Sequence, residues 1–115
     1  MSTPVRGVSE ALIRRLVQTF YERVLQDPDL SPIFRDALSH RWGDHLETMV
    51  DFWSSVALKT GRYSGKPHIA HTSLQLTPAL FDRWLELFER TAIEVCNPDI
   101  AAFFVDRARR IAESL

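Results

Sequence analysis

The stretch Tyr63-Ser-Gly-Lys-Pro-His-Ile-Ala-His71 interrupts the helical pattern that fills the rest of this 115-residue chain. Gly65 and Pro67 disfavour a continuous helix, so we expect an irregular connection with at most a short helix at about 67–73. The stretch also holds two of the four histidines. A turn-rich histidine segment with much aromatic mass on either side suggests a cofactor held between helices.

Two amphipathic helices are predicted before this stretch. The first begins after Ser9, a good N-cap, and ends near Asp27-Pro28, because a residue before proline is pushed out of the helical region. The second covers about residues 38–59, with Gly61 as its stop signal. Between them, residues 30–34 are expected to form an apolar corner too short for more than a helical turn, with Phe34 pointing inward. The apolar stripes at helical spacing are Leu12, Ile13, Leu16, Val17, Phe20, Tyr21, Val24 and Leu25 in the first helix, and Trp42, His45, Leu46, Met49, Phe52, Trp53 and Val56 in the second.

Two further helices are predicted after it, and both open with the same signal. Thr77-Pro78 and Asn97-Pro98 each pair a capping residue with proline at the first helical position. Their apolar stripes are Leu80, Phe81, Trp84, Leu85, Phe88, Ala92 and Val95, then Ile100, Phe103, Phe104, Arg107, Ala108 and Ile111. No alternating pattern is long enough for a sheet. The sequence therefore predicts one all-α domain over residues 1–115, a sandwich or bundle of four principal helices.

Composition limits the partners and the compartment. The net charge is −1 with both signs scattered, so no basic block favours nucleic acid or an anionic membrane. No apolar run is long enough to span a bilayer, and residues 1–7 lack the apolar core of a secretory signal. Cys96 is the single cysteine, which fits a reducing compartment. We expect a cytoplasmic protein without nucleic-acid or membrane partners, and a monomer by default.

Three polar-tipped side chains, Tyr21, His45 and Trp84, lie on the predicted buried faces of three different helices. Taken singly, each has an ordinary explanation as a core residue whose polar atom finds a partner. Their combination suggests that they converge on one pocket opposite His71. His68 and His71 are three residues apart and could share a zinc ion, but a structural zinc site needs four ligands and the chain offers no such set.

In their order and spacing, these motifs resemble the truncated hemoglobins, the 2-on-2 helical globins shorter than myoglobin. Phe20-Tyr21-Glu-Arg-Val24 and Leu30-Ser-Pro-Ile-Phe34 resemble the family's second helix and the phenylalanine that packs on the heme. His45-Leu-Glu-Thr-Met-Val-Asp-Phe-Trp53 resembles the distal helix, and the opening stretch resembles the approach to the proximal histidine. The similarity covers roughly residues 9–113. The glycine pairs typical of groups I and II are absent, so the chain resembles group III.

The resemblance implies a 2-on-2 globin-like sandwich of four principal helices around heme b (iron protoporphyrin IX), with His71 as the metal ligand. Group III members typically place a tyrosine, a histidine and a tryptophan on the distal side, and these match Tyr21, His45 and Trp84. The expected apolar contacts of the heme are Phe34, Met49, Phe52 and Trp84, beside the ligand His71. The heme propionates need cationic or polar partners near the pocket mouth, and Arg62, Lys66 and His68 lie in the right segment as alternatives.

The function implied by the resemblance is binding of diatomic ligands, namely O2, NO and CO, with peroxide and cyanide as further candidates. Tyr21 and Trp84 are expected to donate hydrogen bonds to bound O2, while His45 acts as a gate or second donor. So polar a pocket favours redox chemistry, such as NO oxidation or peroxide turnover, over O2 transport, and would need an external reductase. The alternatives are a non-catalytic sensor or carrier, and a heme-free interaction module.

Overall fold

The computed structural model describes residues 7–38, 42–63 and 77–114, and these residues form α-helices without a strand. The helices are α1 (Glu10–Gln26), α2 (Ser31–Leu38), α3 (Trp42–Leu58), α5 (Pro78–Val95) and α6 (Pro98–Ser114). The all-α prediction is therefore confirmed. The short helix expected at about 67–73 lies outside the described residues.

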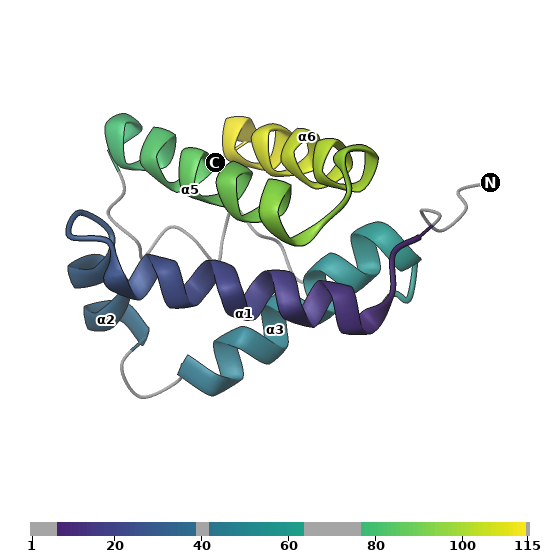
Figure 1. Ribbon diagram of the computed structural model, residues 1–115. Helices are drawn as coiled ribbons and strands as arrows, with labels where there is room; N and C mark the ends of the chain where they lie inside the picture. Colours follow the sequence, from purple (N-terminus) through teal and green to yellow (C-terminus); the bar gives the residue numbers. More distant parts are fainter. Residues whose placement is uncertain (1–6, 39–41, 64–76, 115) are drawn as a thin grey trace.

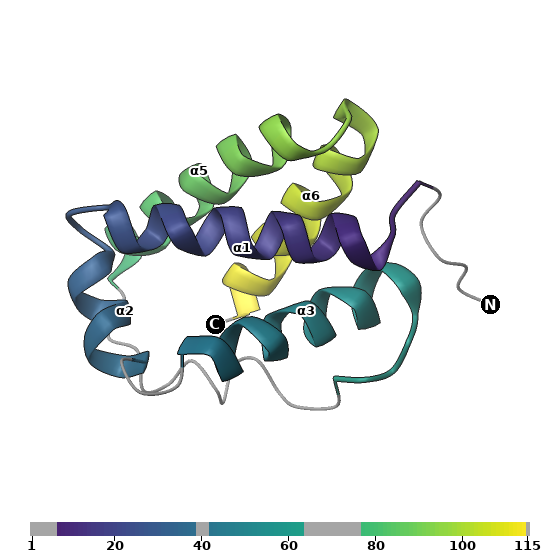
Figure 2. The ribbon, with the colours of Figure 1, turned by 60° about the horizontal axis from the view of Figure 1, so that its bottom comes forward.

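The four long helices form two layers, α1 with α3 and α5 with α6 (Figure 1). Contact between α1 and α5 joins the layers, and α2 packs at the C-terminal end of α1 (Figure 2). Helix α1 thus touches three other helices, so its side chains reach both the core between the layers and the site described below.

The predicted starts of α1, α5 and α6 are confirmed by their caps. The Ser9 hydroxyl accepts the Leu12 N–H at 3.1 Å, and the Thr77 hydroxyl accepts the Leu80 N–H at 3.2 Å. The side-chain oxygen of Asn97 accepts the N–H of Ile100 at 3.0 Å. Each of these bonds satisfies a backbone donor that has no partner inside its own helix.

One predicted boundary is wrong. The corner at residues 30–34 is the start of an eight-residue helix, α2. Pro32 is its second residue, where a missing N–H costs no helical hydrogen bond, so this proline does not break the helix. Helix α3 is described from Trp42 to Leu58, within the predicted range of about 38–59, and Leu38 belongs to α2. After its last residue the chain is left-handed at Lys59, with φ of 59°, and at the predicted stop residue Gly61, with φ of 72°.

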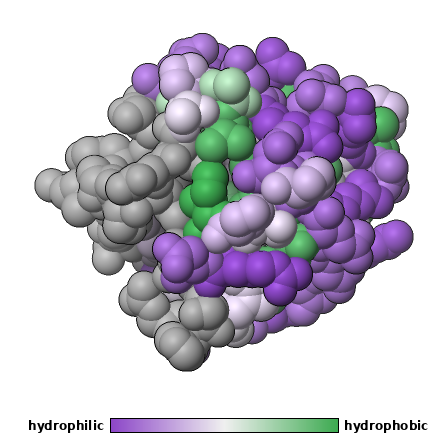
Figure 3. Space-filling model, turned by 90° about the vertical axis from the view of Figure 1, so that its left-hand side faces the viewer, coloured by the Kyte–Doolittle hydropathy of each residue, from purple (hydrophilic) through white to green (hydrophobic). Residues whose placement is uncertain are grey.

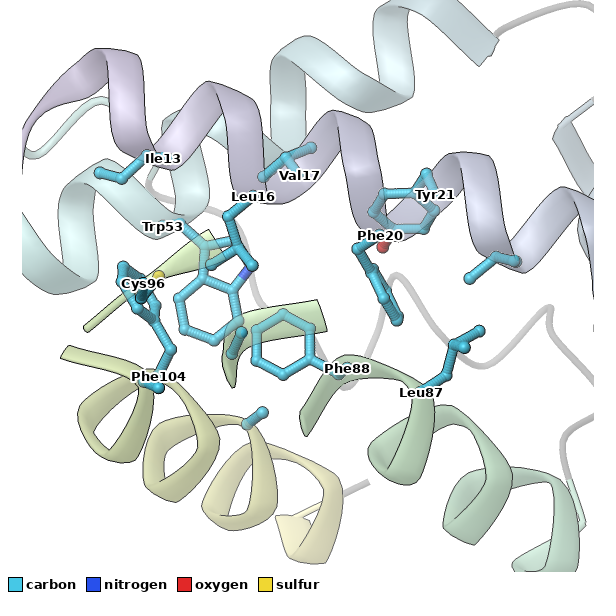
Figure 4. Packing of buried hydrophobic residues seen from close by; sticks show 14 of the residues in the cluster. Ile13, Leu16, Val17, Phe20, Tyr21, Trp53, Leu87, Phe88, Cys96 and Phe104 are labelled. Carbon is cyan, nitrogen blue, oxygen red and sulfur yellow. The ribbon is translucent and has the colours of Figure 1, made fainter. Parts of the chain in front are cut away.

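The core lies between the two layers and is rich in aromatic rings. Phe20, Trp53, Phe88 and Phe104 meet there from α1, α3, α5 and α6 (Figure 4). On α3 the fully buried residues are Val50, Trp53, Ser54 and Ala57. Of the stripe predicted for this helix only Trp53 is buried, and its other members are half-buried. The face of α3 that packs against the core is therefore turned by about one residue from the predicted one.

Candidate functional site

Tyr21 lies at the junction of α1, α2 and α3. It is buried, with 4% of its surface exposed, and projects from α1 beside Phe20 (Figure 4). Its ring meets three others edge-on: Phe34 of α2 at 6.2 Å, Trp42 of α3 at 5.5 Å and His45 of α3 at 4.9 Å between centroids. The predicted convergence of Tyr21 and His45 on one place is therefore observed, and Phe34 points inward as expected.

Burial also fixes the protonation state of Tyr21. Removal from water raises the pKa of its phenol well above the usual range, because the charged phenolate loses its hydration. The group therefore stays protonated at neutral and mildly alkaline pH. A protonated phenol can donate a hydrogen bond to a small polar molecule in the site.

Trp42 belongs to this cluster, although the sequence analysis assigned it only to an apolar stripe. Its ring lies 5.8 Å from that of His45, tilted by 33°, in addition to its contact with Tyr21. The contact between Trp42 and His45 could have been predicted from the sequence, because residues three apart on a helix are neighbours on its surface. Trp42 thus supports the His45 ring from the preceding helical turn.

Trp84, the third predicted member, meets Tyr21 through an intervening ring. Phe20 lies edge-on to both, 4.9 Å from Tyr21 and 5.4 Å from Trp84. Trp84 is half-buried on α5 and stacks on Phe88, with centroids 5.8 Å apart and ring planes 6° apart. The structure therefore places Trp84 one ring away from the Tyr21 cluster.

Met49 and Phe52 continue the face of α3 that begins with His45. The three residues are spaced by four and three positions, which puts them on one side of a helix. Met49 and Phe52 pack against the core and are half-buried. On the side of the molecule where α2 and the start of α5 lie, a strip of hydrophobic residues also reaches the surface between hydrophilic ones (Figure 3).

The half-buried face of α3 and the neighbouring Tyr21 together fit a heme group. Large apolar side chains that are only half-buried form a wall along α3, and the buried Tyr21 hydroxyl and the His45 ring supply its few polar atoms. Ligand pockets are typically built this way, from mostly apolar linings with a small number of placed polar groups. A flat, largely apolar cofactor with a small polar ligand on one side matches that donor set.

Arg62 has partners other than the one expected for it. Its guanidinium donates to the Glu10 carboxylate at 2.7 Å and to the Ser54 hydroxyl at 2.8 Å, and it pairs with Asp51 at 3.1 Å. These bonds tie the end of α3 to the start of α1. The other candidates for the propionates, Lys66 and His68, lie outside the described residues, as does the expected metal ligand His71.

An ion pair that sequence reasoning missed fixes the corner after α1. The Asp27 side chain is 2% exposed and accepts the N–H groups of Asp29 at 2.9 Å and Leu30 at 3.1 Å. Its second oxygen accepts Arg83 Nε at 2.7 Å. Burial alone would raise the pKa of Asp27, but these three donors outweigh it and hold the pKa below its usual value. The Asp27–Arg83 ion pair therefore fixes the turn after α1 against α5, next to Trp84.

The two helical layers and the aromatic site define a small globin, and comparison with known proteins agrees. The model of the bacterial-like globin family matches residues 7–102. The chain is 34% identical over 109 residues to the group 3 truncated hemoglobin ctb of Campylobacter jejuni, covering 91% of this chain and 86% of that protein. It is 30% identical over 86 residues to the group 2 truncated hemoglobin YjbI of Bacillus subtilis, covering 73% of this chain and 64% of that one.

The fold gives the same answer. The crystal structure of the group III truncated hemoglobin from Campylobacter jejuni matches with a TM-score of 0.87 and 32% identity, over 97% of this chain and 91% of that one. The chain therefore belongs to the group III truncated hemoglobins, and the resemblance predicted from sequence is confirmed. It is a heme globin. Among the described residues, no helix is long and apolar enough to cross a membrane.

Proposed function

We propose that this globin holds heme b as a single domain over residues 1–115, with His71 as the iron ligand. Bound heme supplies an iron centre that takes up O2, NO or CO. Phe34, Met49, Phe52 and Trp84 would give the apolar contacts. Lys66 and His68 are the better candidates for the propionates, because the Arg62 guanidinium already pairs with two carboxylates. The half-buried apolar face of α3 supports this proposal.

The buried Tyr21 phenol is the observation that carries the ligand chemistry. Rings from α2 and α3 hold it in place, and burial keeps it protonated. Such a donor stabilises negative charge that develops on a bound diatomic molecule without having to reorganise first. The Trp84 indole, which can only donate, is proposed as the second donor.

His45 is proposed as a gate rather than as a permanent iron ligand. It is half-buried, whereas Tyr21 beneath it is buried. An imidazole at the rim can rotate outward at a lower cost than a phenol in the core, because it loses fewer packing contacts. Rotation of His45 away from Trp42 would open a path for ligands, and its return would close the pocket over Tyr21.

Two hydrogen-bond donors in an aromatic pocket favour slow ligand release, so we propose redox chemistry rather than O2 delivery. In the proposed reaction NO and O2, with one electron, give nitrate; peroxide turnover is the related possibility. The electron comes from an external reductase. We place the protein in the cytoplasm as a monomer, acting on small molecules without nucleic-acid or membrane partners.

The test is stopped-flow mixing of the heme-loaded protein, equilibrated with O2, with an excess of NO and a reductant. Nitrate produced over many turnovers per heme supports the proposal. Nitrate limited to one per heme, with no turnover under any reductant, would instead indicate a non-catalytic sensor or carrier. Tyr21→Phe should lower the amount of nitrate formed per oxygenated heme, because O2 escapes from more of the hemes before NO arrives.

A further inference from the structure

We propose that a continuous row of aromatic rings, Trp84–Phe88–Trp53–Phe52–Tyr63, carries single electrons from the surface to the heme pocket and so supports peroxide reduction. The electrons would come from small phenols or ascorbate acting at Tyr63. This inference rests on the proposed heme function, and it names the donor class and the place where the donor acts.

The rings are in contact along the whole row. Trp84 stacks on Phe88 at 5.8 Å with 6° between planes, and Phe88 stacks on Trp53 at 5.4 Å with 14° between planes. Trp53 then meets Phe52 edge-on at 5.1 Å, and Phe52 meets Tyr63 edge-on at 5.2 Å. Phe88 and Trp53 lie face to face in the core between the layers (Figure 4).

The order of residue types suits electron transfer. Indole and phenol rings lose one electron to strong oxidants far more readily than a phenyl ring does. Along the row the oxidisable residues, Trp84, Trp53 and Tyr63, alternate with Phe88 and Phe52, so each step spans one phenyl ring. Phe88 and Trp53 are 2% and 5% exposed, which keeps water from quenching a radical in the interior.

Tyr63 is suited to be the outer end of this row. It is half-buried, so a small donor can reach its ring and water can take its proton. Its position is fixed, since its N–H donates to the Ser55 hydroxyl at 2.9 Å and the preceding residue, Arg62, is tied to Glu10 and Asp51.

Two other rows of rings branch from this one, and each ends at a residue that gives up an electron less readily than Tyr63. From Trp53 a second branch runs through Phe104 at 5.4 Å to Phe103 at a further 5.5 Å, and both of these are phenyl rings. From Trp84 another runs through Phe20 to Tyr21. Oxidising a phenol requires loss of its proton, and the buried phenol of Tyr21 resists that loss. Tyr63 is therefore the favoured end.

The proposed reaction consumes hydrogen peroxide as the oxidant and a phenol or ascorbate as the electron donor. Hydrogen peroxide takes two electrons and two protons and gives two waters. Each electron leaves Tyr63 for Trp53 and then passes to Trp84, while the phenolic proton of Tyr63 goes to water. A phenol or ascorbate then returns one hydrogen atom to the Tyr63 radical. In sum, one peroxide and two phenols yield two waters and two phenoxyl radicals.

The test uses heme-loaded protein mixed with hydrogen peroxide without a donor. Electron paramagnetic resonance of rapidly frozen samples detects a tyrosyl radical, and radicals from two molecules couple into a dityrosine-linked dimer that peptide mass spectrometry assigns. Wild type should give both products at Tyr63. Tyr63→Phe should abolish them, and Trp53→Phe should reduce them severalfold although Tyr63 is present. Phe103→Leu, which changes a half-buried ring off the row, should match wild type.

The outcomes separate the relay from the heme proposal. A Trp53→Phe variant with normal heme absorption and an unchanged yield of Tyr63 dimer would overturn the relay alone. Failure of the wild type to bind heme would overturn both proposals. If Trp53→Phe does not fold, Tyr63→Phe still decides the question. Without its outer end the row should accumulate oxidised Trp53, and oxidation found elsewhere instead would contradict the relay.

Discussion

Replacing Tyr21 by phenylalanine removes one hydroxyl and little else. The ring contacts with Phe34, Trp42 and His45 are made by the aromatic ring, which phenylalanine keeps. A hydrogen bond to an acceptor with charge character contributes about 1.5–3 kcal/mol, and about 1.4 kcal/mol corresponds to a factor of ten. Tyr21→Phe should therefore accelerate O2 dissociation by about tenfold to a hundredfold.

The rate can be measured by stopped-flow displacement of O2 with CO at neutral pH. The chain has two tyrosines, so Tyr63→Phe is the matched control, and its O2 dissociation should equal that of wild type. Because burial raises the pKa of Tyr21, the wild-type rate should also stay constant from about pH 7 to about pH 10, where an ordinary tyrosine is half ionised. An O2 dissociation rate unchanged by Tyr21→Phe would refute the assignment of Tyr21 as the donor.

Two other predictions concern the corner and the gate. Asp27→Asn should destabilise the fold by about 1–3 kcal/mol at neutral pH, because Arg83 and two backbone donors lose a charged acceptor. Since the folded pKa of Asp27 is lowered, this stabilisation is fully present above about pH 4 and is lost as the pH falls through the folded pKa. Urea unfolding of both proteins across pH should therefore show the difference shrinking in acid, and a constant difference would contradict this role. His45→Ala should increase the rate of CO entry measured after flash photolysis. An unchanged entry rate would contradict the role of His45 as a gate.

Local signals made the helix starts predictable. Ser9, Thr77 and Asn97 act on backbone groups three residues away, so their effect can be read from sequence alone. The prediction of a corner missed α2 because it considered only the short apolar segment at residues 30–34, whereas the helix continues to Leu38. The buried face of α3 was misjudged because apolar residues lie on two adjacent sides of this helix, and only packing against the core selects Val50 and Ala57.

Only part of the site could be predicted, because most of its contacts join residues that are far apart in the sequence. The convergence of Tyr21 and His45 was suggested by their positions on the buried faces of two helices. The resemblance to a known family supported it, because a family carries tertiary information that periodicity lacks. The Asp27–Arg83 pair joins residues 56 positions apart, and nothing local to either residue marks the other as its partner. The placement of Trp84 behind Phe20 likewise depends on how α1 and α5 pack.

The most direct test of the heme assignment is titration of the heme-free protein with hemin, followed by Soret absorption. Wild type should bind one heme per chain, and the thermal midpoint should rise on binding, because a ligand that binds only the folded state stabilises it. His71→Ala should weaken binding and change the Soret spectrum, while the control His40→Ala, at a histidine with no proposed heme contact, should keep the wild-type affinity and spectrum. A His71→Ala protein with wild-type affinity and spectrum, or equal thermal midpoints with and without heme, would contradict the assignment.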